Sequence, residues 1–207
     1  MMTFIRAMSL AFFPILGLVH PAVAADGPSF DCAKAGSSAE EVVCSDPELS
    51  ALDVELAEIY GAALAAAEGL DAGAEEAVAT LKATQRGWIK GRDECWKAED
   101  LRACVETAYL QRSAELVVTW MLREPYTEAA WRCDDNPANE VYVMYFDTRL
   151  PAIRIEYGDG VEAMTASPTA SGTRYDGSLG RFFWEKSGMA LFAWVEGDEQ
   201  ECVLVAG

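Results

Sequence analysis

The sequence has 207 residues, which is enough for one large domain or two small ones. Its 34 acidic residues outnumber 16 Lys and Arg residues, and the formal net charge is −18. This balance argues against nucleic acid or an anionic membrane surface as a partner, because both are bound through Lys and Arg. A strongly basic protein partner suits the charge, since opposite net charges accelerate encounter, although the charge would also serve solubility alone.

Residues 1–25 have the features of a secretory signal peptide. Arg6 precedes an apolar run over residues 8–19, and the small residues 22–25 form a cleavage site of the A-x-A type. The run is shorter than the roughly 20 residues that a membrane span needs, and Pro14 interrupts it. We therefore expect cleavage after residue 25, no membrane insertion, and a mature protein that is periplasmic or secreted.

The single histidine, His20, lies in that predicted signal peptide. A mature chain without histidine lacks the base of Ser-His and Cys-His nucleophile systems, and it lacks any zinc site that contains His. We therefore expect a protein that is not an enzyme, with no catalytic residue, no metal and no cofactor. A carboxylate-based hydrolase of the cell wall stays open as an alternative, because it needs only two carboxyl groups at a defined separation.

Residues 26–125 are predicted to form a helical domain, because they are rich in Ala, Glu and Leu and poor in β-branched runs. Asp46 can cap a helix that begins at Pro47, and apolar residues then recur every three or four positions. A second helix is expected from about residue 74, and a third over about residues 99–122. Short connections between the helices predict an antiparallel hairpin or a small bundle.

Cysteines are expected to staple this helical domain. The chain has six cysteines, an even number, which in an exported protein predicts a disulfide framework. Proximity in sequence favours the pairs Cys32 with Cys44 and Cys95 with Cys104, although four cysteines allow three connectivities.

Residues 126–207 are predicted to form a second domain made of strands. Aromatic residues, Val and Gly are frequent here, and short segments alternate or run apolar. The expected strands are 140–146, 152–157, 161–167, 181–186, 189–195 and 202–205. Closely spaced short strands favour a small antiparallel barrel or sandwich. Cys133 and Cys202 lie near its two ends and are expected to staple it, because so small a core needs a crosslink. The fold class is therefore α+β in two domains.

A spaced set of residues in the helical half resembles a known family. The set comprises Asp31-Cys32, Glu40 to Cys44, Leu49, Leu52-Asp53, Leu56, Tyr60, Gln85 to Trp88, Arg92, Cys95 and Cys104. It resembles the small helical domain of LprI-type lysozyme inhibitors over roughly residues 30–120. Gln85, Trp88 and Arg92 are interpreted mainly as structure, with Trp88 in the core. Arg92 is expected to pair with Asp53 across the hairpin, because a partly buried charge needs a partner. The functional alternative is a cleft lined by Gln85 and Arg92.

A second motif lies between Cys133 and Cys202. Its residues are Ser171, Gly172, Tyr175, Phe183, Trp184 and Lys186, in a Ser-Gly-x-x-Tyr segment followed by an aromatic pair and a lysine. This pattern resembles the MliC/PliC family of c-type lysozyme inhibitors over about residues 131–205. The resemblance implies an eight-stranded antiparallel barrel. Taken from the residues alone, Tyr175 and Trp184 fit a core better than a contact surface.

The resemblance also implies which residues meet the partner. In that family the serine and the lysine enter the lysozyme cleft, and here they correspond to Ser171 and Lys186. Gly172, Arg174 and Tyr175 complete the expected lysozyme-binding set. The chemistry is reasonable, because lysozyme cleaves with two carboxyl groups that a lysine and a serine can engage.

One position departs from the family pattern. The family has glycine directly after the lysine, whereas Ser187 stands here and Gly188 follows. The turn, and with it the aim of Lys186, is therefore in question. Glu185 is a further concern, because it could pair with Lys186 or Arg181 and weaken the expected contact.

These observations lead to one main hypothesis and one alternative. The main hypothesis is an exported proteinaceous inhibitor of c-type lysozyme that blocks the active-site cleft. The alternative is a non-catalytic module of the cell envelope that binds a different target, with the helical domain as a candidate binding surface.

Overall fold

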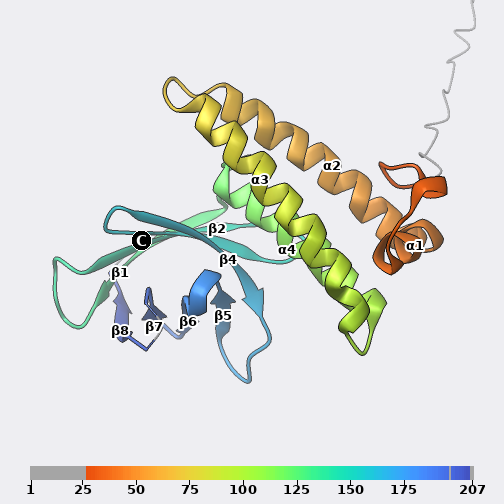
Figure 1. Cartoon of the computed structure of the whole chain (residues 1–207). Helices are drawn as coiled ribbons and strands as arrows, with labels where there is room; N and C mark the ends of the chain where they lie inside the picture. The colour runs from red at the N-terminus through yellow and green to blue at the C-terminus, as the bar shows by residue number, and fades with distance from the viewer. Residues whose placement is uncertain (1–26, 196, 206–207) are drawn as a thin grey trace, which may run out of the picture.

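The computed structural model describes residues 27–195 and 197–205, so the predicted signal peptide lies outside the described residues. The chain first forms a set of helices and then a closed barrel of strands (Figure 1). In the described part of the chain, no helix has the length and apolar character needed to cross a bilayer. The structure thus has the two-part α+β architecture that the sequence predicted.

Four α-helices make up the first part. They are α1 (Ser38–Ser45), α2 (Pro47–Glu68), α3 (Ala74–Asp93) and α4 (Leu101–Thr119), with 3-10 turns at Cys32–Lys34 and Glu94–Lys97. The expected start of α2 is confirmed, because the Asp46 carboxylate accepts hydrogen bonds from the backbone N–H groups of Glu48 and Leu49. Helix α1 was not among the expected elements. Its N-terminus is capped by Ser37, whose hydroxyl accepts from the N–H of Glu40.

Disulfides join Cys32 to Cys44 and Cys95 to Cys104, the local pairs that proximity favoured. The first ties the N-terminal 3-10 turn to α1, and the second ties the turn after α3 to α4. Both crosslinks therefore hold one end of the bundle, where the helices are short or change direction.

Asp53 and Arg92 do not form the direct ion pair that was expected. Tyr109 of α4 lies between them: it donates to Asp53 Oδ1 over 2.8 Å and accepts from Arg92 Nη1 over 2.8 Å. The charge of Arg92 is balanced instead by Asp93 at 2.8 Å and Glu40 at 3.5 Å. Desolvation opposes the charged form of Arg92, but the groups around it raise its pKa, so this buried cation is fully paired.

Eight antiparallel strands close the barrel in sequence order, and β8 pairs with β1. They are β1 (Thr127–Cys133), β2 (Glu140–Phe146), β3 (Ala152–Tyr157), β4 (Gly160–Ser167), β5 (Thr173–Asp176), β6 (Phe182–Lys186), β7 (Met189–Ala193) and β8 (Glu199–Leu204). The six strands expected from alternation are all present. β1 and β5 were missing from that set, and they complete the barrel that the family resemblance implied.

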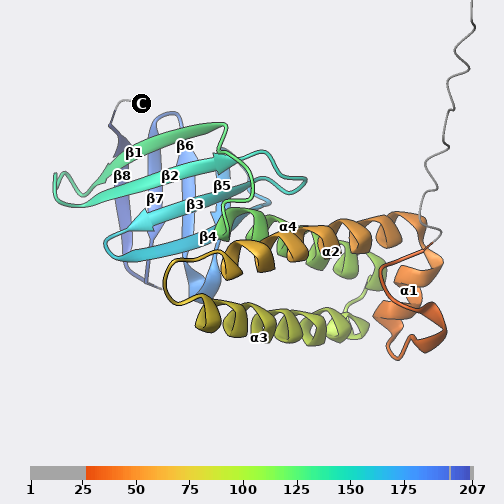
Figure 2. The ribbon, with the colours of Figure 1, turned by 90° about the horizontal axis from the view of Figure 1, so that it is seen from above.

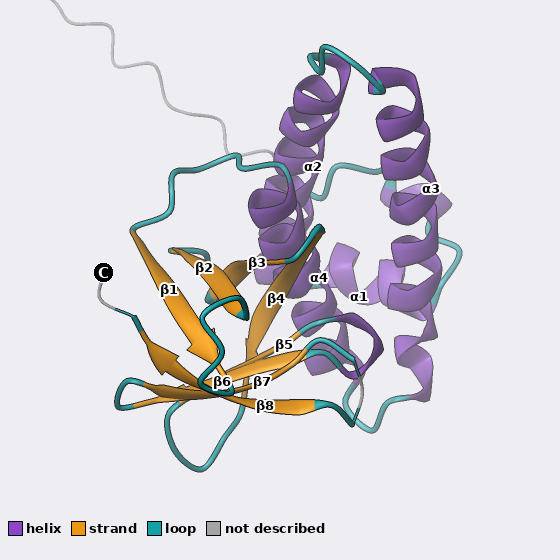
Figure 3. Ribbon diagram, turned by 90° about the vertical axis from the view of Figure 1, so that its left-hand side faces the viewer, coloured by secondary structure: helices purple, strands orange, loops and turns teal. Residues whose placement is uncertain are grey.

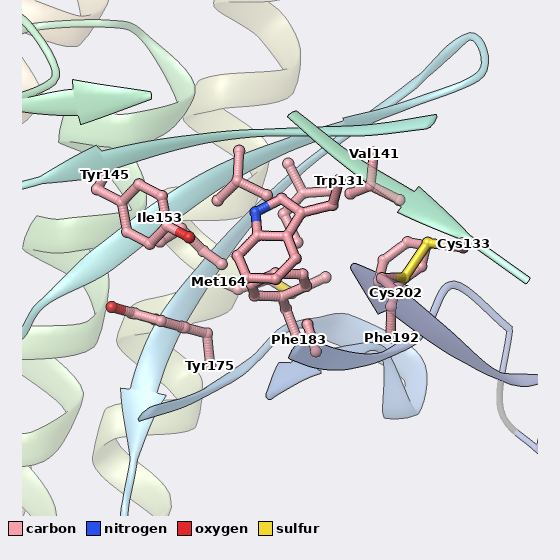
Figure 4. Packing of buried hydrophobic residues seen from close by; sticks show 13 residues of the cluster. Trp131, Cys133, Val141, Tyr145, Ile153, Met164, Tyr175, Phe183, Phe192 and Cys202 are labelled. Carbon is pink, nitrogen blue, oxygen red and sulfur yellow. A yellow bond between two sulfur atoms is a disulfide. The ribbon is translucent and has the colours of Figure 1, made fainter. Parts of the chain in front are cut away.

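The barrel interior is filled by one apolar cluster (Figure 4). Trp131 packs edge-on against Phe183 near its centre, with ring centroids 5.3 Å apart. Figure 4 shows Tyr145 and Tyr175 facing each other at one end of the cluster and the Cys133–Cys202 disulfide at the other. The disulfide links β1 to β8, and so it closes the barrel covalently at the seam between its first and last strands.

The helices and the barrel share a second, smaller core. Phe146 of β2 and Ala152 of β3 are buried against Ala114, Val117 and Val118 of α4. Figures 2 and 3 show α4 lying beside the wall formed by β3 and β4. The outer face of this wall is therefore covered near the end of β2 and the start of β3, whereas β5, β6 and β7 contribute no residue to this shared core.

Candidate functional site at one mouth of the barrel

Antiparallel order brings alternate strand ends to the same mouth of the barrel. The start of β5 and the end of β6 meet there, since Thr173 pairs with Glu185. Lys186 then pairs with Met189 across the hairpin to β7. Residues 171–173 and 185–189, which are separate in sequence, are thereby brought together at one rim, called here the site mouth.

The loop before β5 lies directly against the end of β6. A Cβ placed on Gly172 would lie 2.3 Å from the carbonyl oxygen of Glu185 and 3.0 Å from the Cβ of Lys186. Only glycine fits this close approach, and its φ of +70° is a second reason for glycine here. The two segments line a shallow hollow, whose residues are Gly172, Thr173, Glu185, Lys186, Ser187 and Gly188.

Trp184 fixes the position of the serine loop. Its side chain projects from the outer face of β6, and its Nε1–H donates a 2.8 Å hydrogen bond to the carbonyl oxygen of Ser171. Core packing was the preferred interpretation of Trp184 from the sequence, but the residue is only partly buried and acts as a brace between two rim segments. The sequence gives only a weak indication of this bracing role: a tryptophan carries a polar N–H that needs a hydrogen-bond partner when it is buried.

The turn after the lysine has the tight geometry of a two-residue hairpin. Ser187 has φ +54° and Gly188 has φ +78°, so both central residues are left-handed, as a type I′ turn requires. Ser187 therefore occupies a position where glycine is preferred, yet the turn still forms. The departure from the family pattern leaves Lys186 in register with Met189.

Lys186 is exposed at the rim. Within residues 27–195 and 197–205, no carboxylate lies within 4.0 Å of its ammonium group. The two competing pairings considered for Glu185 do not occur. Arg181 pairs with Glu162 at 2.7 Å, and the Glu185 carboxylate accepts a hydrogen bond of 2.7 Å from the hydroxyl of Tyr145 inside the mouth.

Arg174 and Tyr175 lie next to this region on β5, with Arg174 outside the barrel and Tyr175 inside it. The Arg174 guanidinium pairs with Asp176 at 2.8 Å and stacks over the ring of Phe182 at 4.1 Å, outside the barrel. Tyr175 points inward and is 4% exposed, with its ring 6.3 Å from that of Tyr145. Burial raises the pKa of the Tyr175 hydroxyl, which keeps it a neutral phenol. Of the expected set, Ser171, Gly172 and Lys186 thus gather at the rim, while Tyr175 lies beneath it.

The helical alternative has a different geometry. Trp88 and Arg92 border a groove between α3 and α4, but Gln85 is held by Arg112, whose Nε donates to it over 2.9 Å. Trp88 packs edge-on against Tyr109 with ring centroids 5.2 Å apart. These contacts are internal, and they favour the structural interpretation of the helical motif.

Comparison with known families agrees with this two-part architecture. The family model described as "Lysozyme inhibitor LprI" matches residues 32–128. The model described as "Membrane-bound lysozyme-inhibitor of c-type lysozyme", MliC, matches residues 131–201. Helices and barrel thus each match a lysozyme-inhibitor family model, in the order that the two sequence resemblances implied.

Comparison with individual proteins identifies the family of the whole chain. Proteins named "Lipoprotein LprI" from Mycobacterium bovis and from two strains of Mycobacterium tuberculosis are each 30% identical to it over 164 residues. The matched region covers 78% of this chain and 77% of each relative. The chain belongs to the LprI family.

Proposed function

We propose that this protein is an exported inhibitor of c-type lysozyme that inserts the Ser171 loop and Lys186 into the active-site cleft. The observation that carries the proposal is the convergence of these two segments. Gly172 lies against Glu185 and Lys186 so closely that a Cβ would clash, and Trp184 holds the Ser171 carbonyl. Two family matches to lysozyme inhibitors in one chain support the same target class.

The chemistry of the target explains the choice of groups. Lysozyme uses one carboxyl group as an acid and an ionised one as nucleophile or stabiliser. The exposed ammonium of Lys186 would pair with the ionised carboxylate, and the hydroxyl of Ser171 would hydrogen-bond the other. Charge-assisted hydrogen bonds of this kind are stronger than neutral ones, particularly where water is excluded.

Electrostatics support a basic partner. The formal net charge of −18 attracts a basic enzyme, and Lys186 is the only lysine after residue 97. The exposed cation at the rim of an acidic protein would therefore be delivered to the acidic cleft of an otherwise basic partner. Export to the periplasm or beyond, after cleavage near residue 25, would bring the inhibitor to the compartment where lysozyme attacks the wall.

The proposed role needs no catalysis. In this reading the protein acts by occupying the cleft, and Gly172, Arg174 and Tyr175 shape and support the inserted rim. The purified protein is then expected to leave cell-wall substrate intact over long incubation. Steady release of wall fragments without added lysozyme would instead favour the carboxylate-based hydrolase.

Titration of c-type lysozyme with the protein in a cell-wall turbidity assay tests the proposal. Lysozyme activity should fall to its minimum when the inhibitor reaches a near-equimolar ratio. Lys186→Ala should raise Kd by roughly thirtyfold, the size of a central interface contact of about 2 kcal/mol, and Ser171→Ala should raise it less.

Lys82→Ala is the matched control, because it removes the same charge from an exposed position on α3. Its Kd should stay close to that of the unmodified protein. Full lysozyme activity at large excess of the unmodified protein would refute the function. An unchanged Kd for Lys186→Ala would refute the site assignment alone.

A further inference from the structure

Glu185 is a carboxylate without a cationic partner at the site mouth. It lies on β6 directly before Lys186, and its side chain turns inward while that of Lys186 faces solvent. Tyr145 is its one hydrogen-bond donor among the described residues. Arg174 on β5 pairs with Asp176, and Arg181 just before β6 pairs with Glu162, so neither arginine forms an ion pair with Glu185.

Such a carboxylate is unfavourable for the isolated protein. Desolvation raises the pKa of Glu185, and the hydrogen bond from Tyr145 offsets this only in part. A half-buried charge that lacks a counter-ion costs stability, and a glutamine of the same shape would keep the hydrogen bond without that cost. The position therefore needs an explanation other than folding.

The tyrosine that binds this carboxylate, Tyr145, lies next to two further tyrosine rings, those of Tyr175 and Tyr126. Tyr145 and Tyr175 lie on either side of the barrel axis, with ring centroids 6.3 Å apart (Figure 4). Tyr126, in the segment between α4 and β1, lies 6.3 Å from Tyr145 and is 65% exposed. It is anchored there because its N–H donates to the carbonyl oxygen of Tyr145 over 2.9 Å. An exposed tyrosine ring beside a carboxylate is a favourable environment for a cation.

We propose that Glu185, together with the exposed ring of Tyr126 next to its hydrogen-bond donor Tyr145, receives a cationic side chain, a guanidinium or an ammonium, from the lysozyme surface next to the cleft. This inference rests on the proposed function and adds a second, opposite charge contact to it. The Lys186 ammonium would form an ion pair with a lysozyme carboxylate, and the Glu185 carboxylate would form an ion pair with a lysozyme cation.

The two contacts come from adjacent residues and so have a fixed separation. Glu185 and Lys186 border the same hollow, from opposite faces of one strand. A pair of opposite charges at fixed spacing selects a partner that carries the complementary pair, which a lone lysine cannot do. The unpaired carboxylate would thus serve specificity at the expense of the stability of the free protein.

Glu185→Gln in the full mature chain tests this assignment, with purified c-type lysozyme as the probe. Glu199→Gln on β8 is the matched control, because it removes an equal charge from an exposed position at the opposite end of the barrel. Kd is measured by calorimetry at low and moderate salt, and stability by urea unfolding at neutral pH. We expect Glu185→Gln to raise Kd about tenfold or more and to weaken its salt dependence, while stability holds or increases.

Tyr126→Leu, which changes a side chain outside the core, should raise Kd several-fold without loss of stability. The inference is overturned if the unmodified protein binds lysozyme and Glu185→Gln binds equally well. It is also overturned if Glu185→Gln loses binding and stability together, because a disturbed strand would then explain the weaker binding. If the unmodified protein itself does not bind, the proposed function fails and this inference falls with it.

Discussion

Replacing Gly172 by alanine measures how closely the serine loop depends on β6. The new Cβ would lie 2.3 Å from the Glu185 carbonyl oxygen, a backbone atom that cannot move without displacing the strand. The left-handed φ of +70° adds about 1 kcal/mol of backbone strain for a residue with a Cβ. Displacing a packed backbone costs a further 1–3 kcal/mol, so the total loss should be about 2–4 kcal/mol.

Gly188→Ala is the control that separates these two contributions. Gly188 has a similar φ of +78°, but a Cβ there meets nothing within 4 Å. It should therefore cost only the backbone strain of about 1 kcal/mol. Urea unfolding of both variants gives the free energies, and the turbidity assay gives inhibition. Equal losses of stability, or full inhibition by Gly172→Ala, would contradict the close contact of loop and strand on which the site rests.

Three further substitutions test other contacts of the structure. Trp184→Phe removes the hydrogen bond to the Ser171 carbonyl; we expect a loss of about 1 kcal/mol in unfolding free energy and weaker inhibition, and unchanged Kd would exclude a bracing role. Phe146→Ala empties the core shared with α4 and should cost about 3–5 kcal/mol by urea unfolding, whereas Phe146→Leu should cost far less. Because the pKa of Glu185 is raised in the folded state, its ionisation destabilises the protein, so the unfolding free energy relative to Glu185→Gln should fall as pH rises from below 4.5 through the folded-state pKa. A difference curve that is flat with pH would contradict this desolvation.

Local pattern was a good guide to most of the elements. The bounds of β2 and β3 were predicted to the residue, because each is an apolar run flanked by turn residues. The start of α2 followed from the capping capacity of Asp46. β1 and β5 were missed, because each begins with exposed or partly buried residues and β5 is only four residues long. Barrel closure itself came from family resemblance, because no local pattern distinguishes it from a sandwich.

The candidate site was predicted only in outline. Ser171 and Lys186 were selected by their spacing within a family motif, but their proximity depends on β5–β6 pairing and on the close packing of Gly172. The bond from Trp184 to Ser171 links residues 13 apart, and the one from Tyr145 to Glu185 links residues 40 apart. Such hydrogen bonds depend on which strands pair with each other, and the periodicity of the sequence does not predict strand pairing.

The sequence by itself determined the acidic charge, the absence of histidine after residue 20 and the order of helices before strands, because these depend on composition or on residues close in the chain. It favoured the local disulfide pairs by proximity alone, and the structure has those pairs. Only the tertiary structure decided that Tyr109 mediates between Asp53 and Arg92 and that α4 covers the β3–β4 wall. It also decided that Glu185 faces into the mouth beside an outward Lys186. Each of these outcomes depends on how side chains from segments distant in sequence pack together in a dense interior, which no local pattern specifies.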